Sequence, residues 1–278
     1  MFGLRGIKRP AAGSSGHGGL KKTFRECLIL GDSIAAGFYS APGNSWPWKI
    51  KQYLDSVAPG QWTTRLYAKG GLGSIIFNPD WNATATGGPF TQWMQTTPEI
   101  AFIELSANNL AMSNTYDGSL RYDGTLRGYS TPQECMDWYE ADIRAGVAYL
   151  LTRGITPAKI HILGQWPMGS DAQFDARGQR FVGGTSKGWV GMADLPAGEN
   201  MWNLWNYGTP TPGATFIGIK PLAESLGCTF VDMTDVYGVG YNPQIDPSGY
   251  VYQPDGSYVH LTDAGAQKWQ EKLQPFLS

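Results

Sequence analysis

Short apolar runs alternate with stretches of helical periodicity along most of the chain. The apolar runs are rich in β-branched and aromatic residues and are bounded by Gly, Pro or Asn, a pattern typical of buried parallel strands. Because strands and helices alternate in this way, the pattern predicts a three-layer α/β sandwich around a parallel sheet of about five strands. The five expected strands are Cys27–Leu30, Thr64–Ala68, Ile100–Leu105, Lys159–Leu163 and Thr229–Met233.

Capping residues and helix-ending residues locate four helices between and after these strands. A Thr-Pro-Gln-Glu capping box, with Pro at the first helical position, marks the start of the longest helix. Gly and Pro mark the ends. The helices are expected to begin after Ser45, at Pro132, at Lys220 and near Thr262, and to end before Pro59, near Arg153, at Leu226 and before Pro275.

Three stretches do not follow this alternation. Residues 1–22 are expected to form a flexible, basic Gly/Ser-rich arm ahead of a single domain at 23–278. The arm carries five basic residues and no acidic one, which leaves −7 for the rest of a chain whose net charge is −2. An acidic body argues against nucleic acid as a partner. Residues 110–130 and 167–215 are rich in Gly and aromatic residues, which predicts ordered loops that cover or build a binding surface.

The expected compartment rests on the absence of an apolar segment that could span a membrane or direct secretion. No apolar run approaches the ~18 residues of a membrane span, and none near the N-terminus has the length of a secretory signal. We therefore expect a cytoplasmic protein or a component of an assembled particle such as a virion. The three cysteines, Cys27, Cys135 and Cys228, fit neither a zinc spacing nor a disulfide framework.

The strongest chemical signal is the first expected strand, which runs straight into Gly31-Asp32-Ser33. Sites in open α/β sheets form at the carboxyl ends of strands, and the backbone N–H groups there can stabilise an oxyanion. This segment alone fits a capped turn equally well. A serine nucleophile needs a base, and the chain has three histidines. His17 lies in the arm and His161 lies inside a strand, which leaves His260 as the candidate base.

Two further segments follow strands and carry possible oxyanion donors. The third expected strand leads into Ser106-Ala-Asn-Asn109, where the Asn108 side chain could donate to the oxygen that Ser33 chemistry makes negative. The Gly-rich turn Lys69–Ser74 follows the second strand and can lend a backbone N–H. It lacks the phosphate-loop spacing, so a nucleotide site is not indicated.

In this order, these segments resemble the SGNH/GDSL hydrolases, a superfamily of esterases and lipases. Gly31-Asp-Ser-Ile34 matches the first block of the family, with Ile in place of the usual Leu. Gly73 falls where the family has its oxyanion glycine, and Gly71 is the alternative. Ser106–Asn109 matches the third block, with Ser and Asn replacing the usual Gly and Asp. The resemblance implies a flavodoxin-like fold without a cofactor.

The last block departs most from the family pattern. His260 is present, but Asp255 lies five residues before it, and Ser257 takes the usual place of the Asp. The resemblance implies Ser33 as nucleophile, His260 as base and Asp255 as the acid that orients His260. Asp246 and a backbone carbonyl are the alternatives for this acid.

The resemblance also implies an oxyanion hole and a range of substrates. The backbone N–H groups of Ser33 and Gly73 and the amide of Asn108 would hold the oxyanion. Family members act on lipids, thioesters and acetylated sugars, and the 11 tryptophans and the uncharged polar composition favour sugars. Candidate substrate-binding residues are Asp32, Trp189, Trp202 and Trp205, although the tryptophans could equally pack the 167–215 insertion onto the sheet.

The predicted function is hydrolysis of short-chain, acetyl esters on a carbohydrate or polysaccharide. Two alternatives stay open. One is a lipid esterase or thioesterase, which an exposed apolar patch beside Ser33 would favour. The other is a non-catalytic carbohydrate-binding or particle structural module that keeps the fold.

Overall fold

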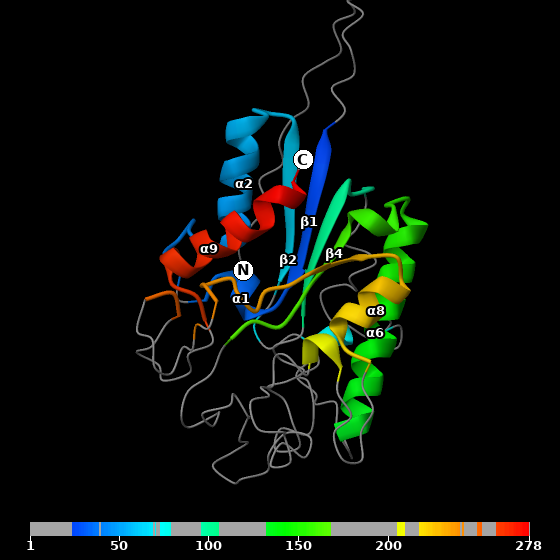
Figure 1. Cartoon of the computed structure of the whole chain (residues 1–278). Helices are drawn as coiled ribbons and strands as arrows, with labels where there is room; N and C mark the ends of the chain where they lie inside the picture. The colour runs from blue at the N-terminus through cyan, green and yellow to red at the C-terminus, as the bar shows by residue number, and fades with distance from the viewer. Residues whose placement is uncertain are drawn as a thin grey trace, which may run out of the picture.

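Five parallel strands form one sheet in the order β2-β1-β3-β4-β5 (Figure 1). The computed structural model describes residues 24–38, 40–68, 70, 73–78, 96–105, 132–167, 205–208, 217–239, 241, 249–251 and 260–277. The strands are β1 (Arg25–Gly31), β2 (Trp62–Ala68), β3 (Ile100–Glu104), β4 (Ile160–Leu163) and β5 (Thr229–Val231). This is the predicted all-parallel α/β architecture.

Helices cover both faces of the sheet, with α2 and α9 on one side and α6 and α8 on the other (Figure 1). No helix in the described ranges has both the length and the apolar composition needed to cross a membrane. The longer helices are α2 (Trp46–Val57), α6 (Pro132–Thr152), α8 (Ile219–Ser225) and α9 (Asp263–Leu273). The short ones are α1 (Ser33–Ala36), η1 (Ser74–Phe77), η2 (Pro157–Lys159) and η4 (Gln274–Phe276).

The predicted elements agree with the structure to within about two residues at most ends. Strand β5 ends earlier than expected, at Val231. The reason is that the Asp232 carboxylate accepts hydrogen bonds from the Thr234 backbone N–H at 2.9 Å and from its hydroxyl at 2.7 Å, which turns the chain. The predicted arm at 1–22 and nearly all of the predicted loops at 110–130 and 167–215 lie outside the described residues.

A cluster of buried indole rings docks the last helix against the rest of the domain. The ring of Trp269 on α9 lies 5.6 Å from Trp46 of α2 and 4.7 Å from Trp166, which follows β4. Its indole N–H donates to the hydroxyl of Tyr237 at 3.0 Å. All three indole side chains are fully buried. Large aromatic side chains dominate core energetics, so this cluster holds α9 in place.

Helix α6 approaches η1 closely enough to leave no room for a side chain at Gly146. A Cβ built there would lie 2.4 Å from Cγ of the Phe77 ring in η1. Because η1 starts directly after Gly73, this close packing also fixes the position of a predicted oxyanion residue.

We expect Gly146→Ala to lower the free energy of unfolding by about 1–3 kcal/mol through overpacking against Phe77. Helix propensity alone would predict the opposite sign, because Ala is favoured over Gly by about 1 kcal/mol. Urea unfolding measures the difference, and Ala148→Ser on the exposed side of α6 is the matched control, with an effect within about 0.5 kcal/mol. A stabilised Gly146→Ala protein would contradict this packing.

Candidate active site

Strand β1 delivers Ser33 to the carboxyl edge of the sheet. The next residue after the strand, Asp32, caps the one-turn helix α1, because its carboxylate accepts a hydrogen bond from the Ile34 backbone N–H at 2.7 Å. Gly37 ends the helix with a φ of 79°, in the left-handed region that favours glycine. Ser33 is therefore held as the first residue of a short, capped helix, with its side chain half-buried.

The segment that directly follows His260 is fixed by contacts within α9 and with residues 250 and 251. Thr262 caps α9 by accepting from the Gly265 backbone N–H at 3.2 Å, and its own N–H donates to the Tyr250 carbonyl at 3.1 Å. Leu261 forms an antiparallel bridge with Val251. The backbones at Gly265 and Tyr250 approach so closely that a Cβ at Gly265 would lie 2.0 Å from the Tyr250 carbonyl oxygen. His260 thus stands at a rigid entry into α9.

These two segments meet in a hydrogen bond between side chains that are 227 residues apart in the sequence. His260 Nε2 lies 3.0 Å from Ser33 Oγ, within the range required for proton transfer between a nucleophile and a general base. Both side chains are partly open to solvent. The structure therefore brings together the predicted nucleophile and the predicted base.

The loop between α1 and α2 packs against the histidine segment. The Phe38 backbone N–H donates to the Ser33 carbonyl at 3.1 Å, and the Phe38 ring stacks on the imidazole with 5.9 Å between ring centroids. Asp263, the first residue of α9, accepts from the Ala41 N–H at 3.0 Å and from the Asn44 amide at 2.7 Å. This loop ties the nucleophile side of the site to the base side.

Gly73 is the N-cap residue of η1, the element that follows β2 in the chain. The next residue, Ser74, is fully buried, and its hydroxyl donates to the Asp142 carboxylate of α6 at 2.9 Å. The Asn78 amide donates to the same carboxylate at 3.4 Å. Because both bonds hold η1 on α6, the backbone at Gly73 is fixed, as an oxyanion donor requires.

A pair of buried carboxyl groups lies beneath the nucleophile. Asp32 and Glu104 are fully buried, and the Asp32 backbone N–H donates to Glu104 Oε2 at 3.4 Å. Burial raises the pKa of Asp32 to about 7. Burial, and then the neighbouring Asp32 charge, raise the pKa of Glu104 well above its usual value. Two carboxylates this close cannot both ionise easily. A hydrogen bond between the two side chains raises the pKa of Glu104 and lowers the pKa of Asp32, which favours Glu104 as the donor.

Sequence reasoning missed Glu104 and Asp142. The available signal for Glu104 was a single charged residue in the apolar run Ile100–Leu105. For Asp142 it was a carboxylate on the same helix face as Tyr139 and Ile143, both of which are buried. A buried acid needs a hydrogen-bond partner, and the partner of neither residue can be identified from the neighbouring sequence.

Two of the candidate substrate-binding residues lie buried in the structure. Asp32 is fully buried and serves as the cap of α1, so its side chain does not face a substrate. Trp205 is 2% exposed, and its ring packs on Tyr139 at 5.1 Å, so it belongs to the core. Large aromatic residues in a polar stretch bury their rings wherever the core reaches them.

His161 lies in β4, inside a strand as expected, and its side chain belongs to the core. Its ring lies 5.1 Å from Phe102 and 5.0 Å from Phe276. Burial, aided by the charge of Lys159, lowers the pKa of His161 to about 4. The remaining predicted site residues, Asp255, Asn108, Trp189 and Trp202, lie outside the described residues, as do the alternatives Asp246, Ser257 and Gly71.

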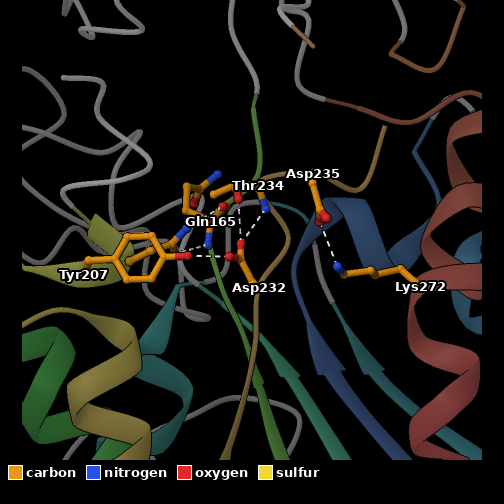
Figure 2. Close-up of polar contacts among 7 residues, drawn as sticks. Gln165, Tyr207, Asp232, Thr234, Asp235 and Lys272 are labelled. Carbon is orange, nitrogen blue, oxygen red and sulfur yellow. Dashed lines mark hydrogen bonds and ion pairs between the residues drawn. The ribbon is translucent and has the colours of Figure 1, made fainter. Parts of the chain in front are cut away.

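A second polar cluster follows β4 and β5 at the same edge of the sheet (Figure 2). Tyr207 and Thr234 both donate to the Asp232 carboxylate. Beside them, Lys272 of α9 pairs with Asp235 at 2.7 Å and ties this loop to the last helix. In the part of the chain that the structure describes, no group of three or more His, Cys, Asp or Glu side chains could hold a metal ion.

Solved structures of similar fold are found, whereas no family model and no curated protein matches the sequence. The acetyl xylan esterase AlAXEase aligns over 91% of this chain and 100% of its own, at 14% identity and a TM-score of 0.55. TesA aligns over 91% and 98%, at 16% identity and a TM-score of 0.51. A protein from Slackia heliotrinireducens assigned to the SGNH hydrolases aligns over 92% and 100%, at 15% identity and a TM-score of 0.52.

The buried acid pair predicts an unusual pH dependence of stability. Because the folded pKa of Glu104 is raised, the stability that its neutral form provides is present at low pH and is lost as the pH rises above the unfolded value. Glu104→Gln keeps a neutral donor toward Asp32. We expect the melting temperature of this variant, relative to wild type, to be higher at pH 8 than at pH 5 by about 3 °C or more.

Glu99→Gln is the matched control with the opposite sign. A hydrogen bond from Arg25 lowers the pKa of Glu99, so the stability from this pair is present at neutral pH and lost toward acid. The control should therefore be less stable than wild type at pH 7 and equal to it near pH 3. A Glu104→Gln protein whose melting temperature follows that of wild type at every pH would show that Glu104 is ionised.

Proposed function

We propose that this chain, which has the fold of the SGNH/GDSL hydrolases, is a serine ester hydrolase that acts on acetyl esters of carbohydrates. The observation that carries the proposal is the 3.0 Å contact between Ser33 Oγ and His260 Nε2. The contact lies at the carboxyl edge of a parallel sheet, where sites form in this class of fold. A serine next to a histidine that can accept its proton is the arrangement required for nucleophilic catalysis.

In the first half of the proposed reaction, Ser33 Oγ attacks the ester carbonyl carbon. His260 Nε2 accepts the hydroxyl proton, and the carbonyl oxygen becomes an oxyanion. The proposed donors to this oxyanion are the backbone N–H groups of Ser33 and Gly73 and the side-chain amide of Asn108. The intermediate then collapses, the bond to the leaving alcohol breaks, and the imidazolium gives its proton to that alcohol.

The second half releases the acyl group. A water molecule gives a proton to His260 and attacks the acyl-serine carbonyl, which forms a second oxyanion at the same donors. Collapse of this intermediate breaks the bond to Ser33 Oγ, and His260 returns the proton to the serine. A carboxylate on the other ring nitrogen would fix the tautomer and stabilise the imidazolium, and we assign this role to Asp255.

The proposed substrate class rests on composition and on one structural neighbour. The chain is rich in Gly, Trp and uncharged polar residues, which suits a sugar better than a long acyl chain. The AlAXEase structure, whose name describes an acetyl xylan esterase, matches over the whole of its chain. Among the described residues, the exposed apolar side chain that contacts His260 is Phe38. In the described part of the site, one exposed ring is little apolar surface for a lipid.

Ser33→Ala should abolish hydrolysis, and wild type should cleave p-nitrophenyl acetate faster than p-nitrophenyl octanoate. A fluorophosphonate probe should label wild type at Ser33 and leave the variant unlabelled, because the serine oxygen displaces fluoride from phosphorus. Mass spectrometry of the labelled peptide locates the site, and a melting curve of Ser33→Ala shows that the fold is intact. Faster octanoate cleavage would indicate a lipid esterase. A wild-type protein without label or hydrolysis would indicate a non-catalytic module.

Asn108→Ala should lower kcat by roughly 10²–10³, with little change in KM, if its amide holds the oxyanion. The matched control is Asn109→Ala, which should have much less effect, because the family places its donor at the preceding residue. Steady-state kinetics on p-nitrophenyl acetate measures both variants. Equal losses at the two positions would mean that the oxyanion donor is wrongly assigned.

A further inference from the structure

Phe38 is an aromatic ring that lies beside the Ser33–His260 pair and faces solvent. It is 50% exposed, although it is one of the largest apolar side chains in the described part of the protein. Its backbone N–H donates to the Ser33 carbonyl at 3.1 Å, so its position follows that of the proposed nucleophile. The ring is held in place by contacts with the segments of Ser33 and His260. Exposing an apolar ring to water is unfavourable, so its exposure points to a role in binding.

The contacts of the ring show which of its surfaces are occupied. One face stacks on the His260 imidazole, with 5.9 Å between centroids and 28° between planes. Its outer edge lies over Gly70, where a Cβ would come within 3.0 Å of the Phe38 Cζ atom. The residue is 50% exposed despite these two contacts, so part of the ring remains open as a flat apolar platform next to the imidazole.

The position beside His260 determines which part of an ester would reach this platform. In the proposed reaction, Nε2 gives its proton to the leaving alcohol, so the alcohol oxygen must come within about 3 Å of this nitrogen. The group attached to that oxygen then lies on the histidine side of the site, within reach of a ring stacked on the imidazole. The acyl group, held at the oxyanion donors, lies farther away.

We infer that Phe38 is a specificity-determining residue that binds the leaving alcohol, and that it selects a sugar ring by stacking against its C–H face. This inference rests on the proposed function. It adds which residue selects the substrate, and that this residue contacts the alcohol part of the ester and not the acyl part. Sugar rings present a flat C–H face, which packs on an aromatic ring in the way that other apolar surfaces do. A small alkyl alcohol is too short to cover the platform.

The test compares two acetyl esters with different alcohols, glucose pentaacetate and ethyl acetate, by acetate release. Phe38→Leu keeps apolar bulk against the imidazole but loses the flat face. The ratio of kcat/KM for the sugar ester to kcat/KM for ethyl acetate should fall about tenfold in Phe38→Leu and stay within about twofold of wild type in Phe38→Tyr. The ratio is the readout because a displaced imidazole would lower both values equally.

Trp48 provides the matched control. It is another exposed aromatic residue, 45% exposed on α2, where its indole lies beneath Lys51. Trp48→Leu should leave the ratio unchanged. The inference is overturned if Phe38→Leu lowers hydrolysis of both esters by the same factor, which would limit Phe38 to holding the imidazole. It is also overturned if Trp48→Leu changes the ratio as much as Phe38→Leu does.

A binding measurement separates failure of this inference from failure of the proposed function. Ser33→Ala protein is titrated with glucose pentaacetate by calorimetry, alone and combined with Phe38→Leu. About tenfold weaker binding in the double variant supports the platform even if wild type hydrolyses neither ester and a fluorophosphonate leaves Ser33 unlabelled. Equal affinities in the two proteins would overturn the inference, whereas labelling at Ser33 would still support the proposed function.

Discussion

The hydrogen bond between Ser33 and His260 requires two distant segments to meet with an accuracy of a few tenths of an ångström. One turn next to Ser33 or next to His260 could not place both side chains so precisely. On one side the Asp32 carboxylate caps α1, and on the other Thr262 and the tight approach at Gly265 fix the entry to α9. The bonds from Ala41 and Asn44 to the first residue of α9 join the two sides directly. The sheet places the site at its carboxyl edge, whereas the positions of the two side chains are fixed by polar contacts among the loops and helix ends.

Asp32 and Glu104 form a buried polar contact beneath the nucleophile, where an apolar contact would make the protein more stable. Glu104 stands opposite Gly31 across the β1–β3 pairing, and a Cβ at this glycine would approach Glu104 Oε2 to 2.8 Å. The glycine before Asp32 thus leaves the space that the second carboxyl group occupies. The hydrogen bond between the two carboxyl groups makes the contact directional, so the turn into α1 has a defined geometry at a cost in stability.

The sequence predicted the sheet, four helices and the serine–histidine pair because each depends on local patterns or on scarce residue types. Apolar runs mark buried strands wherever they occur, and elimination among three histidines leaves few choices. Glu104 and Asp142 were missed because their partners come from other elements, and the sheet order alone brings them together. The sequence left both interpretations of Trp205 open for a related reason, since composition cannot separate an indole in the core from one on a binding surface.

The place of α9 in the chain order has a consequence for how the protein is made. Ser33 and the first strands leave the ribosome early, whereas the histidine and the helix that holds it come after every strand of the sheet. Domains begin to fold during synthesis, so the growing chain can form much of its sheet before the indole of Trp269 is available to dock on Trp46. In the proposed chemistry, a nascent chain carries a serine without its base, and hydrolysis begins only after α9 has been synthesised and packed.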